Sequence, residues 1–158
     1  MSCGIILKTL KNMESIINKK AHFDYQINDT LIAGIELSGH ETKAIRFGKA
    51  QLTGSFVKIY GRQMWLVGAT IGPYQEKNAP KDFDPSRSRR LLVNKAEIEA
   101  LMGTVSAKKS ILIPLKLFEK KGKIKLEIGM GTSKKKSDKR EVIKKRETKR
   151  EIDRKIKG

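Results

Sequence analysis

The sequence predicts a mainly β fold, a small closed or nearly closed antiparallel barrel with two or three short helices, followed by a basic, largely disordered C-terminal tail. Two observations support this prediction. Between residues 18 and 131, strand-length segments with apolar side chains recur and are separated by short Gly-containing links. After residue 131, basic side chains dominate and large apolar ones almost disappear. We therefore divide the chain into an N-terminal extension (1–17), a barrel (18–131) and a tail (132–158).

A strand and then a helix begin the predicted barrel. Residues 23–28 alternate apolar with polar side chains, as a half-buried strand does, and the alternation resumes after Gly34, which allows a bend or a bulge. The segment Ser38-Gly39-His40-Glu41 has the Ser-x-x-Glu spacing of a capping box. Gly48 stands where a left-handed residue would end a helix of roughly two turns over 42–47.

A hairpin and a long loop come next. We interpret residues 55–59 and 64–69 as two strands, because they flank the short Gly-containing link Tyr60-Gly61-Arg62. Residues 72–90 then collect three prolines together with Gly, Asn, Asp and Ser, which is the composition of an exposed irregular loop. The loop ends in three arginines: Arg87, Arg89 and Arg90.

A second helix and a final pair of strands complete the predicted barrel. Asn94-Lys95-Ala96-Glu97 has the spacing of another capping box, and Gly103 is placed to end the helix. Three apolar residues share one face of this helix: Ile98, Leu101 and Met102. Residues 111–119 and 124–130 are the last two strands, and the alternation is clearest in the second of them.

Charge narrows the class of partner. The chain carries 35 Lys or Arg against 17 Asp or Glu, a formal net charge of +18, with +8 in the tail and +10 on residues 1–131. The tail has few large apolar side chains, so burial cannot offset the entropy of ordering it, and we expect a polyanionic partner. Nucleic acid is favoured over a merely solvated cationic surface. A membrane partner is disfavoured because the tail lacks Trp, Phe and Leu.

The sequence offers no catalytic or metal-binding constellation. It has no nucleophile elbow, no His paired with a plausible Ser or Cys, and no phosphate-cradling glycine motif, so we expect a protein that is not an enzyme and uses no cofactor. Cys3, His22 and His40 are too few for a structural zinc site, and a single cysteine favours a reducing compartment. The apolar run at 5–7 is too short for a signal peptide or a membrane span. We therefore expect a cytoplasmic location.

Five motifs occur in order along residues 18–158. They are 18–25 (Asn-Lys-Lys-Ala-His-Phe-Asp-Tyr), 33–50 (from Ala-Gly-Ile-Glu-Leu to Phe-Gly-Lys-Ala), 84–92 (Asp-Pro-Ser-Arg-Ser-Arg-Arg-Leu-Leu), 113–117 (Ile-Pro-Leu-Lys-Leu) and 138–140 (Asp-Lys-Arg). With this order and spacing, the chain resembles the family of the tmRNA-binding protein SmpB, also called SsrA-binding protein.

The resemblance implies an oligonucleotide-binding (OB)-type barrel that binds the tRNA-like domain of tmRNA and delivers it to ribosomes stalled on messages without a stop codon, the process of trans-translation. The tail would enter the empty mRNA channel, lined by small-subunit rRNA near the decoding centre. The family's RNA-facing positions correspond to Asn18, Lys19, Leu92 and Lys125. On charge and context we add six basic residues: Lys20, Lys43, Arg46, Lys49, Arg87 and Arg89. The motif Asp138-Lys139-Arg140 corresponds to the family's motif for accommodation in the ribosomal A site.

Local signals in the tail predict a conditional helix. Asp138 is placed to N-cap a helix, with Glu141 at the reciprocal position. Three acid-first pairs at four-residue spacing each support a helix by only about 0.2 to 0.5 kcal/mol: Glu141 with Lys145, Glu151 with Lys155, and Asp153 with Lys157. This is too little for a free segment, so we expect a tail that is disordered alone and helical beside rRNA phosphates. Ser137 stands where family members often carry a ring, so contacts in the channel should depend on charge and be sensitive to salt.

The residues alone allow other interpretations of the site and of the function. From the residues alone, a core leucine that follows Leu91 is the favoured interpretation of Leu92, and a good fraction of the basic residues form a solvated barrel surface. On composition, the rival function is a barrel-type ribosomal protein or translation factor whose basic tail threads rRNA. Ile32 also stands where many family members have an acidic residue near the RNA-facing first strand.

Overall fold

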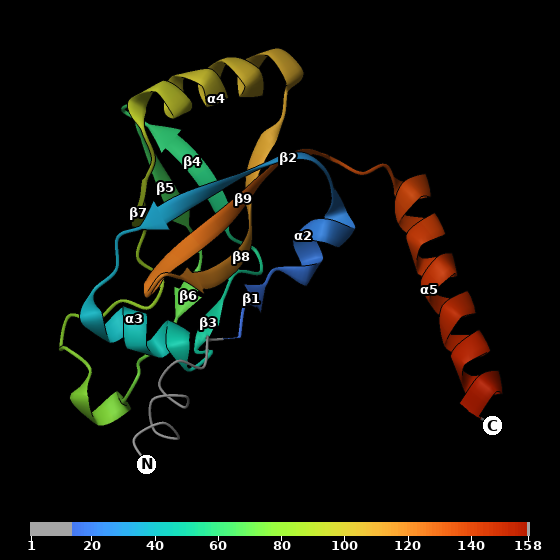
Figure 1. The fold of residues 1–158 in the computed structure, drawn as a ribbon, viewed down its shortest axis with the longest axis horizontal. Coiled ribbons are helices and arrows are strands. Elements are labelled where there is room, and N and C mark those ends of the chain that lie inside the picture. The colour runs from blue at the N-terminus through green and yellow to red at the C-terminus, as the bar shows by residue number, and fades with distance from the viewer. Residues whose placement is uncertain (1–13, 158) are drawn as a thin grey trace.

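The computed structural model describes residues 14–157, and the fold within them is mainly β with four α-helices (Figure 1). The strands are β1 (Ile16–Ile17), β2 (Tyr25–Ile35), β3 (Ala50–Gln51), β4 (Phe56–Tyr60), β5 (Gln63–Val67), β6 (Thr70–Ile71), β7 (Arg89–Leu92), β8 (Ile111–Lys120) and β9 (Lys123–Ser133). The helices are α2 (Lys19–Asp24), α3 (Gly39–Arg46), α4 (Lys95–Lys108) and α5 (Lys136–Lys157), with a 3-10 turn η1 (Glu76–Asn78). Cys3 and most of the predicted extension lie outside the described residues.

Seven strands form one antiparallel sheet in the order β1-β8-β4-β5-β7-β2-β9, and β8 also pairs with β9. Strand pairing therefore runs from β8 through β4, β5, β7, β2 and β9 and returns to β8. β3 and β6 form a separate two-stranded pair. Both ends of the sheet extend beyond the predicted barrel, because β1 lies in the segment assigned to the extension and β9 continues into the first residues assigned to the tail.

One apolar cluster joins the strands to two helices. In β9 the alternation predicted from the sequence places Ile124, Leu126 and Ile128 inward, each at most 6% exposed. Helices α3 and α4 add buried apolar side chains to the same cluster, among them Ile45 and Leu101. Each such side chain stabilises the fold by about 1.5–3 kcal/mol, so burial determines the arrangement of the strands.

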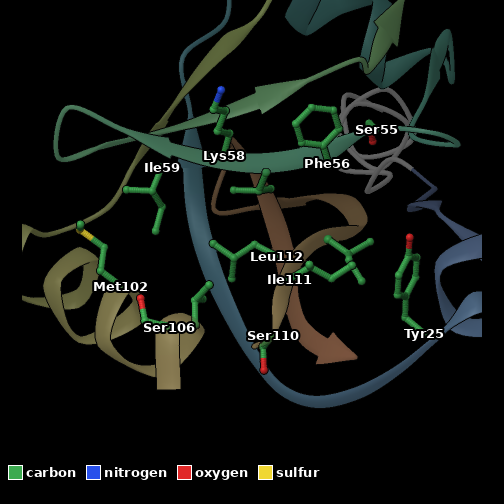
Figure 2. A pocket seen from close by; sticks show the side chains of 13 residues that line it. Tyr25, Ser55, Phe56, Lys58, Ile59, Met102, Ser106, Ser110, Ile111 and Leu112 are labelled. Atoms are coloured by element: carbon green, nitrogen blue, oxygen red, sulfur yellow. The ribbon is translucent and has the colours of Figure 1, made fainter. Parts of the chain in front are cut away.

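The pairing between β4 and β8 is the shortest in the sheet. Only one register pair, Val57↔Leu112, joins the two strands. Beside it, a pocket of about 570 Å³ opens between β4, β8 and α4. Figure 2 shows Phe56, Ile59 and Met102 around this pocket, which is lined mainly by apolar side chains.

Three local predictions are confirmed. Ser38 N-caps α3, its Oγ accepts the Glu41 N–H at 3.2 Å, and the Glu41 carboxylate accepts the Ser38 N–H at 3.2 Å, which completes the capping box. Gly48 follows this helix with φ of 75°. In the hairpin of β4 and β5, Gly61 and Arg62 both have positive φ, the conformation of a two-residue turn that matches the twist of its strands.

Other local predictions are wrong. Residues 19–24 form helix α2 where a strand was expected from residue 23, and the irregularity in β2 lies between Ile27 and Asp29 and not at Gly34. The Asn94 side chain makes no capping hydrogen bond, so the second capping box is absent. Helix α4 continues through Gly103 to Lys108. Its packed face explains the continuation, because Val105, one turn beyond Leu101, also contacts the core and offsets the low helix propensity of glycine.

The tail also differs from the expectation of a largely disordered segment. Residues Lys136–Lys157 form the 22-residue helix α5, which buries none of its residues. Figure 1 shows α5 projecting beside α2 and away from the sheet. The helix starts two residues before Asp138, so Asp138 lies in the first turn and is not the N-cap. The Lys139 N–H already donates to the Lys135 carbonyl at 3.2 Å.

No helix within residues 14–157 is both long enough and apolar enough to cross a membrane.

Candidate nucleic-acid interface

Three strands bring two of the predicted site residues together around a glycine. Gly34 of β2 pairs with Leu92 of β7 on one side and with Lys125 of β9 on the other. Directly paired residues in antiparallel strands point to the same face of a sheet, so Leu92 and Lys125 flank Gly34 on one face. Leu92 is 54% exposed, which excludes the alternative of a core leucine. The three residues contribute to one pocket of about 340 Å³.

Gly34 provides the space that Leu92 uses. A Cβ added at Gly34 would lie 3.2 Å from the Leu92 Cβ, closer than nine in ten real contacts of this kind, so Leu92 would have to shift. Ile32, two residues earlier on the same strand, is also half exposed and is paired with Glu127. This surface therefore combines two exposed apolar side chains with the ammonium group of Lys125, and we call Gly34, Leu92 and Lys125 the strand site.

Arg46 of α3 lies at the rim of the strand site. Its Nη2 donates to the Gly122 carbonyl at 3.2 Å and forms an ion pair with Glu119 at 3.1 Å, so α3 is fastened to the turn between β8 and β9. Gly122 also lines the pocket of the strand site. The Arg46 side chain remains 43% exposed, which leaves part of the guanidinium accessible to a ligand.

Arg87 and Arg89 converge on one buried carboxylate. Glu41 is 1% exposed, and Arg87 donates to both of its oxygens at 2.7 Å. Arg89, 0% exposed, donates to Glu41 Oε1 from Nε at 3.3 Å and from Nη2 at 3.2 Å. Its remaining donors bind the carbonyls of Ala69, Pro85 and Arg87. Arg89 therefore positions the loop and does not contact a ligand in this conformation, whereas Arg87 stays partly exposed.

The same contacts shift the ionisation of the three groups. Burial alone would raise the pKa of Glu41, but the hydrogen bond from Arg87 and the charge of Arg89 outweigh it, so this pKa is lowered from its ordinary value of 4.5. The hydrogen bond to Glu41 raises the pKa of Arg87. Burial lowers the pKa of Arg89 despite the same carboxylate. Both arginines remain charged at neutral pH because an arginine loses its proton only under strongly basic conditions.

Lys43 and Lys49 approach a tyrosine of the loop that precedes β7. The Lys49 Nζ donates to the Tyr74 carbonyl at 2.9 Å. The Lys43 Nζ lies 6.0 Å from the centroid of the Tyr74 ring. These two lysines therefore lie on a different part of the surface from the strand site. Helix α3 connects the two parts, because it carries Lys43 as well as Arg46 at the rim of the strand site.

Asn18, Lys19 and Lys20 lie at α2, apart from the strand site. Asn18 is 3% exposed, accepts the Ala21 N–H at 3.3 Å as the N-cap of α2, and donates to the Pro114 carbonyl at 2.9 Å. Its side chain is thus engaged within the protein and fixes α2 against β8. Lys19 and Lys20 are exposed.

Helix α5 docks on α2 through a small set of contacts. Lys139 Nζ forms an ion pair with Asp24 at 3.1 Å, and the Arg146 guanidinium lies 5.5 Å from the centroid of the Phe23 ring. Lys134, just before the helix, donates to two α2 carbonyls. Lys139, the middle residue of the Asp138-Lys139-Arg140 motif, is therefore partly buried in an ion pair, whereas Asp138 and Arg140 are exposed.

Sequence reasoning missed three contributors to this surface. Gly34 was noted only for a possible bend, because its close approach to Leu92 depends on which strands become neighbours. Glu41 was noted only as a capping residue, and the available signal was the two-residue spacing of Arg87 and Arg89, which places both on one side of an extended chain. Asp24 as a partner for α5 carried no sequence signal.

Residues 14–157 contain no group of three His, Cys, Asp or Glu side chains that could hold a metal ion.

Comparisons with known proteins agree on one family. The family model described as SmpB protein matches residues 15–158. An SsrA-binding protein of Chlorobaculum tepidum is 49% identical over 139 residues, covering 87% of this chain and 88% of the relative. An SsrA-binding protein of Acetivibrio thermocellus is 44% identical over 140 residues, with 89% and 90% covered. A chain in the solved structure described as "tmRNA-SmpB: a journey to the center of the bacterial ribosome" is 35% identical, with a TM-score of 0.64 over 82% of this chain and 94% of that one.

Proposed function

The chain belongs to the SmpB family, and on this premise we propose that it is a non-catalytic RNA-binding adaptor of ribosome rescue. It binds the tRNA-like domain of tmRNA and delivers it to stalled ribosomes for trans-translation. Its partners are tmRNA and the small-subunit rRNA of the decoding centre and mRNA channel, so it works in the cytoplasm. The relatives' name, SsrA-binding protein, and the description of the solved tmRNA-SmpB structure support this proposal.

The strand site is the observation on which the proposal depends most. Proteins hold structured RNA through phosphate and 2′-hydroxyl contacts, and they stack unpaired bases on flat side-chain surfaces. Leu92 offers an exposed apolar surface, and Lys125 offers a cation on the other side of Gly34, with strand β2 between them. Arg46 adds a second cation at the rim. A nucleotide lying over Gly34 can therefore place its base against Leu92 while Lys125 neutralises its phosphate.

We assign the fold of residues 18–131 to the OB-type barrels. The strand pairing that leaves β8 through β4 and returns to it through β9 supports this assignment. Within that barrel, Lys19, Lys20, Lys43, Lys49 and Arg87 contact RNA from exposed positions, whereas Asn18 and Arg89 act by positioning α2 and the loop before β7.

The tail makes a separate contribution. We propose that α5 is in exchange with a disordered state in the free protein and becomes a stable helix in the empty mRNA channel, where phosphates relieve the repulsion among its cations. Asp138, Lys139 and Arg140 then support accommodation in the A site. The absence of buried residues in α5 leaves it able to leave α2.

Replacement of the strand site tests the first role. Lys125→Ala and Leu92→Ala should each weaken binding to the isolated tRNA-like domain, whereas Lys58→Ala, an exposed lysine on β4, should not. Binding by the wild-type chain should weaken on the order of a thousandfold between roughly 50 and 200 mM salt if about six phosphates are neutralised. A flat salt dependence would contradict this phosphate-binding surface. Equal affinity for bulk rRNA would instead favour a ribosomal protein or translation factor with an rRNA-threading tail.

Replacement of the accommodation motif tests the second role. Changing Asp138, Lys139 and Arg140 together to Ala should leave the affinity for the tRNA-like domain unchanged and stop tagging of nascent chains in a reconstituted translation reaction. Loss of RNA binding in this triple variant would contradict the division of labour between barrel and tail.

A further inference from the structure

An aromatic pair, formed by the exposed Phe47 and the partly buried Tyr74, lies at the end of α3, outside the strand site. Phe47, the C-cap of α3, is 66% exposed, although its phenyl ring has no polar group to interact with water. Its ring centroid lies 5.0 Å from that of Tyr74, with the planes tilted by 41°. The pair therefore presents the exposed Phe47 ring, held on one side by Tyr74, to a flat ligand.

The second ring of the pair is fixed from several sides. The Tyr74 N–H donates to His40 Nε2 at 3.0 Å, and the Lys49 Nζ donates to the Tyr74 carbonyl at 2.9 Å. His40 packs edge-on against both Tyr74 and Phe83, with centroids 6.5 Å and 5.2 Å apart. Because the backbone of Tyr74 is bonded on both its donor and its acceptor side, the Tyr74 half of the pair is preorganised and loses little freedom on binding a ligand.

Two lysines lie beside the pair. The Lys43 Nζ lies 6.0 Å from the Tyr74 centroid, and the Lys49 Nζ donates to the Tyr74 carbonyl. The carboxylate of α3 in the first turn, Glu41, is buried and bound to Arg87 and Arg89, so it does not neutralise these cations at the surface. An apolar protein partner would gain nothing from the cations, whereas a nucleotide uses both the rings and the positive charge.

We propose that Phe47 and Tyr74 form a stacking platform for one unpaired RNA base, with Lys43 and Lys49 holding the adjacent phosphates. The platform rests on the proposed RNA-binding function and adds a second site to it. Because Arg46 links α3 to the turn beside the strand site, one RNA can reach both sites along α3. An unpaired base of tmRNA and an unpaired base of rRNA share this chemistry, so the test must distinguish them.

Photo-crosslinking locates the base. Benzoylphenylalanine replaces Phe47 in the full chain, which is bound in one arm to the tRNA-like domain alone and in the other to tmRNA on stalled ribosomes. We expect a cross-link to a single unpaired nucleotide. A cross-link in both arms identifies a base of the tRNA-like domain, and one formed only on ribosomes is assigned to tmRNA or rRNA by sequencing the linked RNA. A cross-link to a ribosomal protein or to a helical stretch of RNA, or no cross-link in either arm, would overturn the platform.

Affinity for the cross-linked RNA provides the energetic test. Phe47→Ala should weaken binding about 5- to 150-fold, the range for one stacked base, and Phe47→Leu should weaken it although it keeps an apolar side chain. Phe47→Trp should retain binding. Phe56→Ala and Tyr60→Ala, which remove exposed rings from β4, serve as matched controls and should bind as the wild type.

The two sites can fail separately. If Lys125→Ala weakens binding and Phe47→Ala does not, the platform is rejected and the adaptor function stands. If the wild-type chain does not bind the tRNA-like domain at all, the adaptor function itself is rejected. Phe47 is mostly exposed, so its variants should keep the wild-type melting temperature, and Phe47→Leu covers the case in which Phe47→Ala does not fold.

Discussion

The sheet body, residues 16–133, and helix α5 are held in place by different kinds of interaction. The body buries a continuous apolar cluster together with one charged network, so its conformation is determined by contacts distant in sequence. Helix α5 buries none of its 22 residues, and apart from its own backbone hydrogen bonds it depends on contacts with α2. The comparison shows that one chain can combine a site fixed by packing with an arm whose conformation depends on its surroundings.

Magnitudes support this contrast. A partly exposed ion pair such as Lys139 with Asp24 contributes about 0–1 kcal/mol, and an exposed cation–π contact such as Arg146 with Phe23 about 0.5–1 kcal/mol. Fixing the backbone of a single residue costs about 1–2 kcal/mol before helix hydrogen bonds and propensity offset it. The contacts with α2 therefore bias where α5 lies but cannot hold it against a polyanion that competes for its cations.

The largest effect should come from the charged network of the body. Glu41→Gln keeps the shape of the side chain but leaves Arg89 buried without a counter-charge, which should lower the free energy of unfolding by roughly 3–5 kcal/mol. Urea denaturation of the full chain measures this change. Glu99→Gln, at an exposed position of α4, is the matched control and should change stability little. Equal stability of the two variants would mean that the ion pairs of Glu41 do not stabilise the sheet body.

Acidic pH should weaken the same network, with a smaller effect on the free energy of unfolding than the substitution has. The folded-state pKa of Glu41 is lowered below the ordinary value of 4.5, so its contribution is fully present above pH 4.5 and is lost as the pH falls through the lowered value. The free energy of unfolding should therefore decrease as the pH falls below 4.5, by less in Glu41→Gln than in the wild type. Identical acid profiles for the two proteins would show that other carboxylates account for the decrease.

The body was largely predictable from the sequence, and the reasons are local. Alternation in β9, the capping box of Ser38 and Glu41, and the turn at Gly61 each depend on residues within one element, and each is confirmed. The errors arise where distant packing decides. Helix α4 passes Gly103 because Val105 finds a core contact.

The strand site was predictable only in part. Leu92 and Lys125 were named through the resemblance to a family, and their meeting across Gly34 depends on the order of β7, β2 and β9, which no local pattern specifies. The buried position of Arg89 was missed for a similar reason, because charge alone cannot distinguish a ligand-binding arginine from one that binds a carboxylate inside the fold. Residue type indicated the chemistry, and the neighbouring strands determined which side chains are available for it.

The smallest effect on stability should come from the contacts between α2 and α5. A measurement that resolves individual segments is needed there, because the change in the free energy of unfolding of the whole chain is small. Asp24→Asn combined with Phe23→Ala removes the ion pair and the cation–π contact, and the ion pair itself contributes no more than about 1 kcal/mol. Amide hydrogen exchange should nevertheless become faster across residues 139–150 while exchange in β9 is unchanged, because α5 has no buried side chain to hold it.

Salt and a matched variant sharpen this last comparison. Salt screens the partly buried ion pair only in the wild type, whereas it screens the repulsion among the cations of α5 in both proteins. Raising the ionic strength should therefore speed exchange in α5 more in the wild type than in the double variant. Asp29→Asn, an exposed aspartate on β2, should exchange like the wild type. If α5 kept its protection in the double variant at high salt, its helix would be stable by itself, and binding in the mRNA channel would then select an arm already formed and would not induce it.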